Sequence, residues 1–123
     1  MPDNIELITI PITLPSRNKL DKMHWSKRHR LGKTYCLLIR NQMRLNNIPK
    51  TKPETMYGIN IMVSRRYRIR DYDNLVGGCK QLLDALTKEG FIYDDDTCYI
   101  GIPNISQCKS KEDSITISRR PIK

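Results

Sequence analysis

Apolar side chains recur at helical spacing between residues 71 and 96, and this is the clearest pattern in the chain. The recurring positions are Leu75, Cys79, Leu82, Leu83 and Leu86. Asp73 and Asn74 are both good N-cap residues, and Gly90 is a natural C-terminal stop. The segment therefore predicts an amphipathic helix with one core face and one charged face.

A second helical pattern extends from Asp21 to Asn46, with Gly32 as a candidate break. Strand patterns are expected at Ile5–Leu14, Met56–Ser64, Phe91–Tyr93, Thr97–Ser106 and Ser114–Arg119. Pro11 interrupts the first of these strands, which favours an edge position or a bulge there.

The main elements follow one another in the order β-α-β-α-β-β. This order predicts an α+β fold with a small mixed sheet and two main helices, while the strand order within the sheet stays open. A chain of 123 residues is the usual size of one domain, so residues 1–123 are expected to form one unit.

The charge is strongly uneven along the chain. The net charge is +9, and 15 of the 22 lysines and arginines lie in residues 1–70, against 4 of the 13 acids. Such a balance favours a polyanionic partner. Asp3 and Glu6 interrupt any signal-peptide core, and no apolar run approaches membrane-spanning length. A soluble, intracellular protein without a membrane partner is therefore expected.

Two basic clusters are candidates for binding nucleic-acid phosphates, namely Lys27, Arg28, Arg30 and Lys33 in the first helix and Arg66, Arg68 and Arg70 after the second strand. If the strand continued, the three arginines would share one face and lead directly to Asp71. A solvated helix surface is the plain alternative for the first cluster. Trp25 is expected to be a core anchor, with a base-stacking platform as the alternative.

Acidic side chains gather at both ends of the predicted second helix. Asp71 and Asp73 precede it, and Asp94, Asp95 and Asp96 follow it. Crowded carboxylates repel one another unless a cation neutralises them, and Mg²⁺ takes carboxylate oxygens. The alternative is that these residues only cap the helix and form a solvated loop. An EF-hand is excluded, because the required ligand and glycine positions hold apolar residues.

The four cysteines are widely spaced and form no CxxC pair, so we expect them to be reduced and mostly buried rather than bound to zinc.

The stretch RDYDNLVGGCKQLLDALTKEGFIYDDD resembles the central motif of the RusA family of Holliday junction resolvases, the crossover junction endodeoxyribonucleases. The matching elements occur in order as Asp71, Asp73 and Asn74, then Lys80, then Asp84, Ala85 and Leu86, then Gly90, then Asp94 and Asp95. The opening segments PITLPSRN and KMHWSKRHR are also similar to those of phage and prophage members. In the family pattern the lysine follows the second aspartate by four positions, whereas here three extra residues intervene around Val76.

The resemblance implies a Mg²⁺-dependent endonuclease, with Mn²⁺ as an alternative metal, that nicks opposing strands of four-way DNA junctions as a homodimer. It implies a metal site built from Asp71, Asp73 and Asp95 with Asp94 in support, and a catalytic Lys80. The expected setting is the cytoplasm of a bacterium or of a phage-infected host cell. A non-catalytic DNA-binding protein is the alternative function, and a nucleotide-sugar transferase would need more chain than is present.

Overall fold

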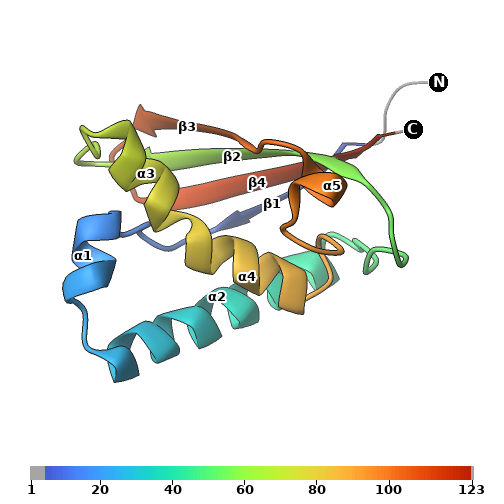
Figure 1. Ribbon diagram of the computed structural model, residues 1–123, viewed down its shortest axis with the longest axis horizontal. Helices are drawn as coiled ribbons and strands as arrows, with labels where there is room; N and C mark the ends of the chain where they lie inside the picture. Colours follow the sequence, from blue (N-terminus) through green and yellow to red (C-terminus); the bar gives the residue numbers. More distant parts are fainter. Residues whose placement is uncertain (1–4, 123) are drawn as a thin grey trace.

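Four strands form a mixed sheet, and helices pack against it (Figure 1). The computed structural model describes residues 5–122. The strands are β1 (Glu6–Ile10), β2 (Tyr57–Arg65), β3 (Asn104–Lys109) and β4 (Ser114–Pro121), in the spatial order β1-β4-β2-β3. β4 is antiparallel to β1 and β2, and β2 is parallel to β3. The predicted α+β class with a small mixed sheet is confirmed, as is the edge position of the first strand.

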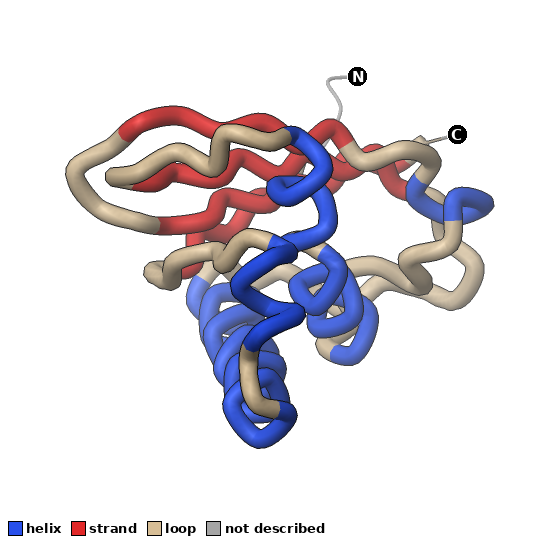
Figure 2. The backbone as a smooth tube through the Cα atoms, turned by 60° about the vertical axis from the view of Figure 1, so that its left-hand side comes forward, coloured by secondary structure: helices blue, strands red, loops and turns tan. Residues whose placement is uncertain are grey.

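The sheet is apolar on one face, and Figure 2 shows most of the helical segments beneath that face. In β2, Ile59, Ile61 and Val63 are buried while the alternate residues Asn60 and Met62 are exposed. This period of two places every second side chain in the core, where each large aliphatic side chain contributes about 1.5–3 kcal/mol. The opposite face is left to solvent.

The predicted helix from Asp21 to Asn46 corresponds to α2 (Trp25–Leu45), and a separate short helix, α1 (Arg17–Lys22), precedes it and overlaps the prediction only at Asp21 and Lys22. The break falls at Met23 and His24, because the imidazole of His24 caps α2 by accepting a hydrogen bond from the backbone N–H of Ser26 at 3.2 Å. Gly32, the candidate break, lies inside α2 and allows close contact with Gln81. No helix within residues 5–122 combines the length and the apolar character needed to cross a membrane.

The predicted second helix consists of α3 (Tyr72–Gly78) and α4 (Lys80–Lys88), joined at Cys79. Four members of its predicted apolar stripe are confirmed as core residues, since Leu75, Cys79, Leu82 and Leu86 are at most 2% exposed, whereas Leu83 is only partly buried. Gly77 and Gly78 let the chain segment before α1 approach α3. A Cβ built on Gly78 would lie 2.2 Å from the carbonyl oxygen of Pro15, so this contact requires glycine.

Three predicted strands need correction. The first strand ends at Ile10, before Pro11, whose missing N–H prevents it from extending the ladder. Phe91–Tyr93 is not a strand, because the backbone N–H of Phe91 bonds instead to the carbonyl of Leu86 at the end of α4. The segment predicted as a strand from Thr97 begins as the short helix α5 (Thr97–Ile100), and β3 starts only at Asn104.

A buried arginine holds in place the segment before the three aspartates Asp94, Asp95 and Asp96. The sequence pattern does not reveal this role. Arg119 on β4 is 1% exposed and donates hydrogen bonds to Glu6 Oε1 at 2.9 Å, the carbonyl of Phe91 at 2.8 Å and the carbonyl of Pro49 at 2.6 Å. Its guanidinium also lies over the rings of Tyr57 and Phe91, 4.9 and 4.8 Å from their centres. Arg119 therefore connects the sheet to the chain that leads into Asp94.

Candidate active site and nucleic-acid interface

Two distant elements of the central motif meet at the start of α4. Lys80 is the first residue of α4, and its Nζ donates a hydrogen bond to Asp95 Oδ2 at 3.0 Å. Asp84, one turn further along the helix, has Oδ1 3.6 Å from the same nitrogen. The three extra residues before Lys80 therefore do not prevent it from contacting Asp95.

The contact favours the charged form of both partners, as the directions of their pKa shifts indicate. The hydrogen bond with Asp95 is the main cause that raises the pKa of Lys80, and the negative charge of Asp84 raises it further. The same hydrogen bond is the main cause that lowers the pKa of Asp95. The Lys80 side chain is still 70% exposed, against 25% for Asp95, so its ammonium group stays accessible to a phosphate.

Asp71 and Asp73 lie at the N-terminal end of α3, away from the join with α4, and both are exposed. Asp71 is the N-cap, and its Oδ1 accepts a hydrogen bond from the backbone N–H of Asp73 at 3.0 Å. Asp96 similarly caps α5 by accepting from the backbone N–H of Cys98 at 2.8 Å. Local capping thus accounts for one carboxylate of each acidic cluster.

The four predicted metal ligands form two separate sets, Asp71 with Asp73 and Asp94 with Asp95. Within residues 5–122, no three His, Cys, Asp or Glu side chains lie close enough to one another to hold a metal ion together. Mg²⁺ usually takes one or two carboxylates and completes its shell with water. Each set has the donor chemistry that Mg²⁺ requires, although the four carboxylates do not make one cage.

The arginine-rich segment forms a loop rather than the strand that its alternation predicts. β2 ends at Arg65, and residues 66–70 have no strand pairing. Arg66, Arg68 and Arg70 are nevertheless exposed, while Ile69 between them is buried. Together with Lys109 they line a hollow of about 600 Å³ directly before Asp71.

Two residues that the sequence analysis did not single out hold this loop in place. The Gln107 amide accepts a hydrogen bond from the backbone N–H of Ile69 at 3.1 Å and donates one to its carbonyl at 2.6 Å. Asp113 accepts from the backbone N–H of Arg66 at 2.6 Å and from the Thr13 hydroxyl at 2.8 Å, and the first of these bonds is the main cause of its lowered pKa. Both partners are distant in sequence, so no local signal identifies them.

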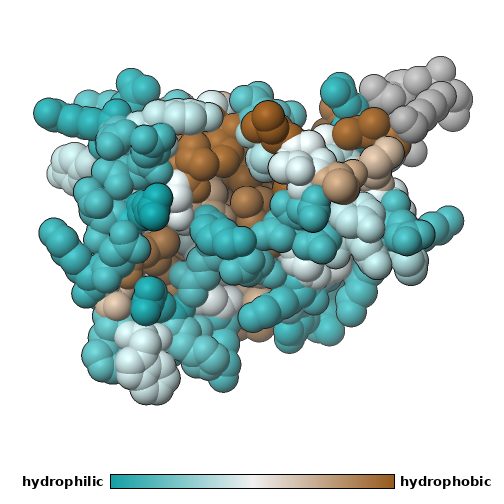
Figure 3. Space-filling view, viewed as in Figure 1, coloured by the Kyte–Doolittle hydropathy of each residue, from teal (hydrophilic) through white to brown (hydrophobic). Residues whose placement is uncertain are grey.

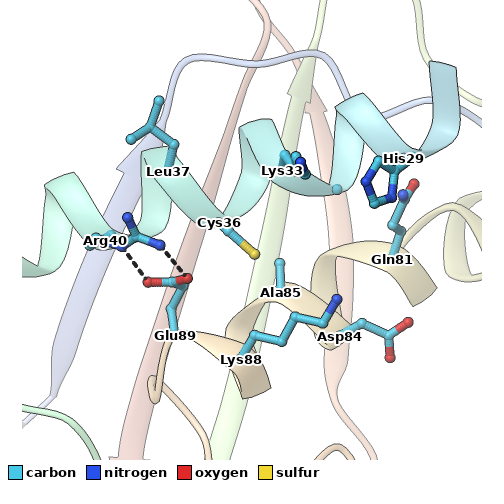
Figure 4. A pocket seen from close by; sticks show the side chains of 11 residues that line it. His29, Lys33, Cys36, Leu37, Arg40, Gln81, Asp84, Ala85, Lys88 and Glu89 are labelled. Carbon is cyan, nitrogen blue, oxygen red and sulfur yellow. Dashed lines mark hydrogen bonds and ion pairs between the residues drawn. The ribbon is translucent and has the colours of Figure 1, made fainter. Parts of the chain in front are cut away.

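The basic residues of α2 are all exposed, but they do not share one face. Arg28 lines a hollow between the first four helices. Lys33 lines a different one between α2 and α4, where Figure 4 shows Arg40 reaching across to Glu89 with Nε 2.8 Å from Oε1. In Figure 1 the start of α2 and the loop before α3 lie at the same end of the molecule.

Trp25 and most of the cysteines are less buried than the sequence predicts. Trp25 is 68% exposed at the start of α2, so it is not a core anchor. All four cysteines are free, as expected, but only Cys79 is buried, and burial raises the pKa of its thiol to about 12. Cys98 and Cys108 are exposed.

No model of a known protein family and no curated protein sequence matches this chain.

Proposed function

We propose that the protein is a Mg²⁺-dependent, structure-specific DNA endonuclease of the RusA type. It would cut four-way DNA junctions by nicking opposing strands during recombination and repair. The observation that carries the proposal is the hydrogen bond between Lys80 and Asp95, which joins two elements of the RusA-like motif that are 15 residues apart. The exposed arginine loop next to Asp71 supports a phosphate-bearing substrate.

Asp71 with Asp73, and Asp95 with Asp94 in support, would form two separate carboxylate pairs that each offer ligands to Mg²⁺, and Mn²⁺ could replace it. When bound, the metal supplies Lewis-acid activation of water and charge stabilisation at the phosphate. Lys80 would offset the charge that develops on the phosphoryl oxygens. Asp95 orients its ammonium group through the 3.0 Å contact, while the exposure of Lys80 leaves it free to meet the substrate.

The active form would be a homodimer in the cytoplasm of a bacterium or a phage-infected host cell. A four-way junction is close to two-fold symmetric, and one chain carries one copy of the proposed site. Paired nicks therefore require two equivalent sites at a fixed separation, which a two-fold dimer provides.

The proposal is tested with Asp71→Asn, Asp73→Asn and Asp95→Asn. Each change removes a metal-holding charge with little change in shape, so junction cleavage should fall by about 100-fold or more while junction binding persists. Glu112→Gln is the matched control, because Glu112 is exposed in the turn between β3 and β4. Control-like cleavage by all three aspartate variants would contradict the assignment.

A non-catalytic DNA-binding protein is the second candidate, and the capping roles of Asp71 and Asp96 favour it. Such a protein would retard junction DNA on a gel equally with Mg²⁺ and with EDTA, and would leave the strands intact. An endonuclease would produce nicked products only when the metal is present.

A further inference from the structure

A hollow lies where α1, α2, α3 and α4 meet. Its volume is about 790 Å³, within the range of roughly 300–1,000 Å³ that small-molecule sites occupy. Figure 3 shows apolar side chains between α1 and α4 in this part of the surface. Leu20, Val76 and Leu83 supply the apolar part of the lining.

Trp25 stands at the edge of this hollow and is 68% exposed. A tryptophan that contributes so little to the core is free to offer an aromatic face to a ligand. It is the first residue of α2, and the His24 cap fixes the backbone at this point. The imidazole ring of His24 also lies beside the indole ring of Trp25, with ring centres 5.7 Å apart.

The charged part of the lining suits a phosphate. Arg17 and Lys80 contribute cations that are partly balanced by Asp21 and Asp84, at 3.8 and 3.6 Å. Arg28 adds a guanidinium that has no carboxylate within 4.0 Å among the described residues. An aromatic face, an apolar floor and an unbalanced guanidinium match the base and the phosphate of one nucleotide.

We propose that this hollow binds one unpaired nucleotide of a branched DNA, with its base stacked on Trp25 and its phosphate on Arg28. The inference rests on the proposed function in taking DNA as the ligand. Lys80 lines the hollow and also contacts Asp95, so the captured nucleotide would lie beside the proposed catalytic group. Displacing a base costs least where it is already unpaired, so the site favours branch points over intact duplex.

The test uses the fluorescence of Trp25, which is the only tryptophan in the chain. The protein is titrated in EDTA with three duplexes of equal length: fully paired, carrying one bulged thymidine, and carrying one bulged abasic site. The bulged thymidine should quench the fluorescence strongly. The abasic duplex has the same number of phosphates and should bind without that quenching.

Affinity measured with labelled DNA supplies a second readout. Stacking on one aromatic side chain is worth about 1–3 kcal/mol, so Trp25→Ala should weaken binding of the bulged thymidine duplex by about 5- to 150-fold. It should leave the abasic duplex within about twofold, and Trp25→Phe should retain most of the affinity. Leu45→Ala is the control, since Leu45 is 74% exposed at the far end of the same helix.

Equal quenching by the thymidine and abasic duplexes, or equal binding by wild type and Trp25→Ala, would overturn the nucleotide site. Because the titration contains no metal, its outcome is independent of cleavage. A protein that cleaves junctions without base-dependent quenching refutes this site alone. If the bulged thymidine quenches Trp25 fluorescence but the protein never cleaves junctions in Mg²⁺, the nucleotide site is supported and the proposed endonuclease activity is refuted.

Discussion

Arg119 is the residue on which the segment leading to the acidic cluster depends most. It is almost completely buried, and three hydrogen bonds tie it to Glu6, Phe91 and Pro49. Nothing in the apolar pattern reveals this role, because an arginine in the alternating β4 segment is equally compatible with an exposed end of the strand. Long-range partners, rather than neighbours in sequence, determine its burial.

Replacing Arg119 with Met should therefore destabilise the protein by about 3 kcal/mol, because it leaves two carbonyls and a carboxylate without their donor. Urea denaturation followed by circular dichroism measures the loss. The control is Lys111→Met, which removes an equally positive but exposed side chain. Equal midpoints for the two variants would contradict the proposed role of Arg119.

The Arg40–Glu89 pair predicts a specific dependence on pH. The hydrogen bond from Arg40 is the main cause that lowers the pKa of Glu89 in the folded protein. The Arg40–Glu89 pair therefore contributes fully to folding stability above the unfolded-state pKa of glutamate, about 4.3. This contribution is lost as the pH falls through the lower pKa that Glu89 has in the folded protein.

Glu89→Gln should melt at a lower temperature than wild type at pH 7, and the difference should shrink as the pH falls from about 5 to 3. Thermal melts across that range test this. Asp21→Asn serves as the control, because the Arg17–Asp21 pair is more than 60% exposed and contributes little at any pH. A melting difference for Glu89→Gln that is constant with pH would contradict the expectation.

At the scale of elements, Gly77 and Gly78 are explained by the close contact between α3 and the segment around Pro15 and Arg17. The two glycines allow the Pro15–Arg17 segment to lie directly against α3, and the join at Cys79 then begins α4 at Lys80. From the sequence, the three extra residues could be interpreted only as nearly one helical turn. The contact with Pro15 belongs to a segment more than 60 residues away, which is why the sequence could not identify it.

Gly78→Ala should destabilise the protein by about 1–3 kcal/mol, because the added Cβ meets backbone that cannot rotate away. Gly58→Ala is the matched control, since the nearest atoms to its Cβ lie 3.9 Å away. Chemical denaturation of both variants should separate them clearly. A Gly78→Ala protein as stable as Gly58→Ala would show that the contact is easily relieved.

Periodicity alone predicts the elements whose apolar pattern is long enough to repeat. The apolar stripe of α3 and α4 and the alternation of β2 were predictable, because each repeats over several residues. Phe91 and Ile92 were not, because a short apolar run looks the same in a strand and in a buried loop. The arginine loop was also mistaken for a strand, since Gln107 and Asp113 hold it from outside the segment.

The arginine loop predicts the salt dependence of DNA binding. Reversing the charge of Arg66 and Arg68 together, to Glu, should lower affinity and reduce the slope of log affinity against log salt by about 2. The control reverses Arg44 and Lys52, which changes the net charge equally away from the loop. Fluorescence anisotropy at several salt concentrations provides the measurement. Unchanged affinity in the Arg66 and Arg68 variant would exclude the loop from the interface.

For the whole molecule, the sheet order and the contact between Lys80 and Asp95 are the features that bring distant parts of the sequence together. Neither could be predicted from the chain alone, because periodicity identifies elements but not their neighbours in space. The acidic residues themselves could be identified, since five aspartates at the two ends of one helix contrast with a net charge of +9. The structure adds that Asp95 lies against Lys80 while Asp71 and Asp73 stay at the start of α3.

The central claim is that this arrangement cuts branched DNA with the help of a divalent cation. The most direct measurement incubates the wild-type protein with an end-labelled synthetic four-way junction and with a linear duplex of the same sequence, each with Mg²⁺ or EDTA. We expect symmetrically placed nicks in opposing strands of the junction, only with Mg²⁺, and an intact linear duplex. An intact junction at protein concentrations that fully bind it in Mg²⁺, or equal cutting of both substrates, would contradict the account.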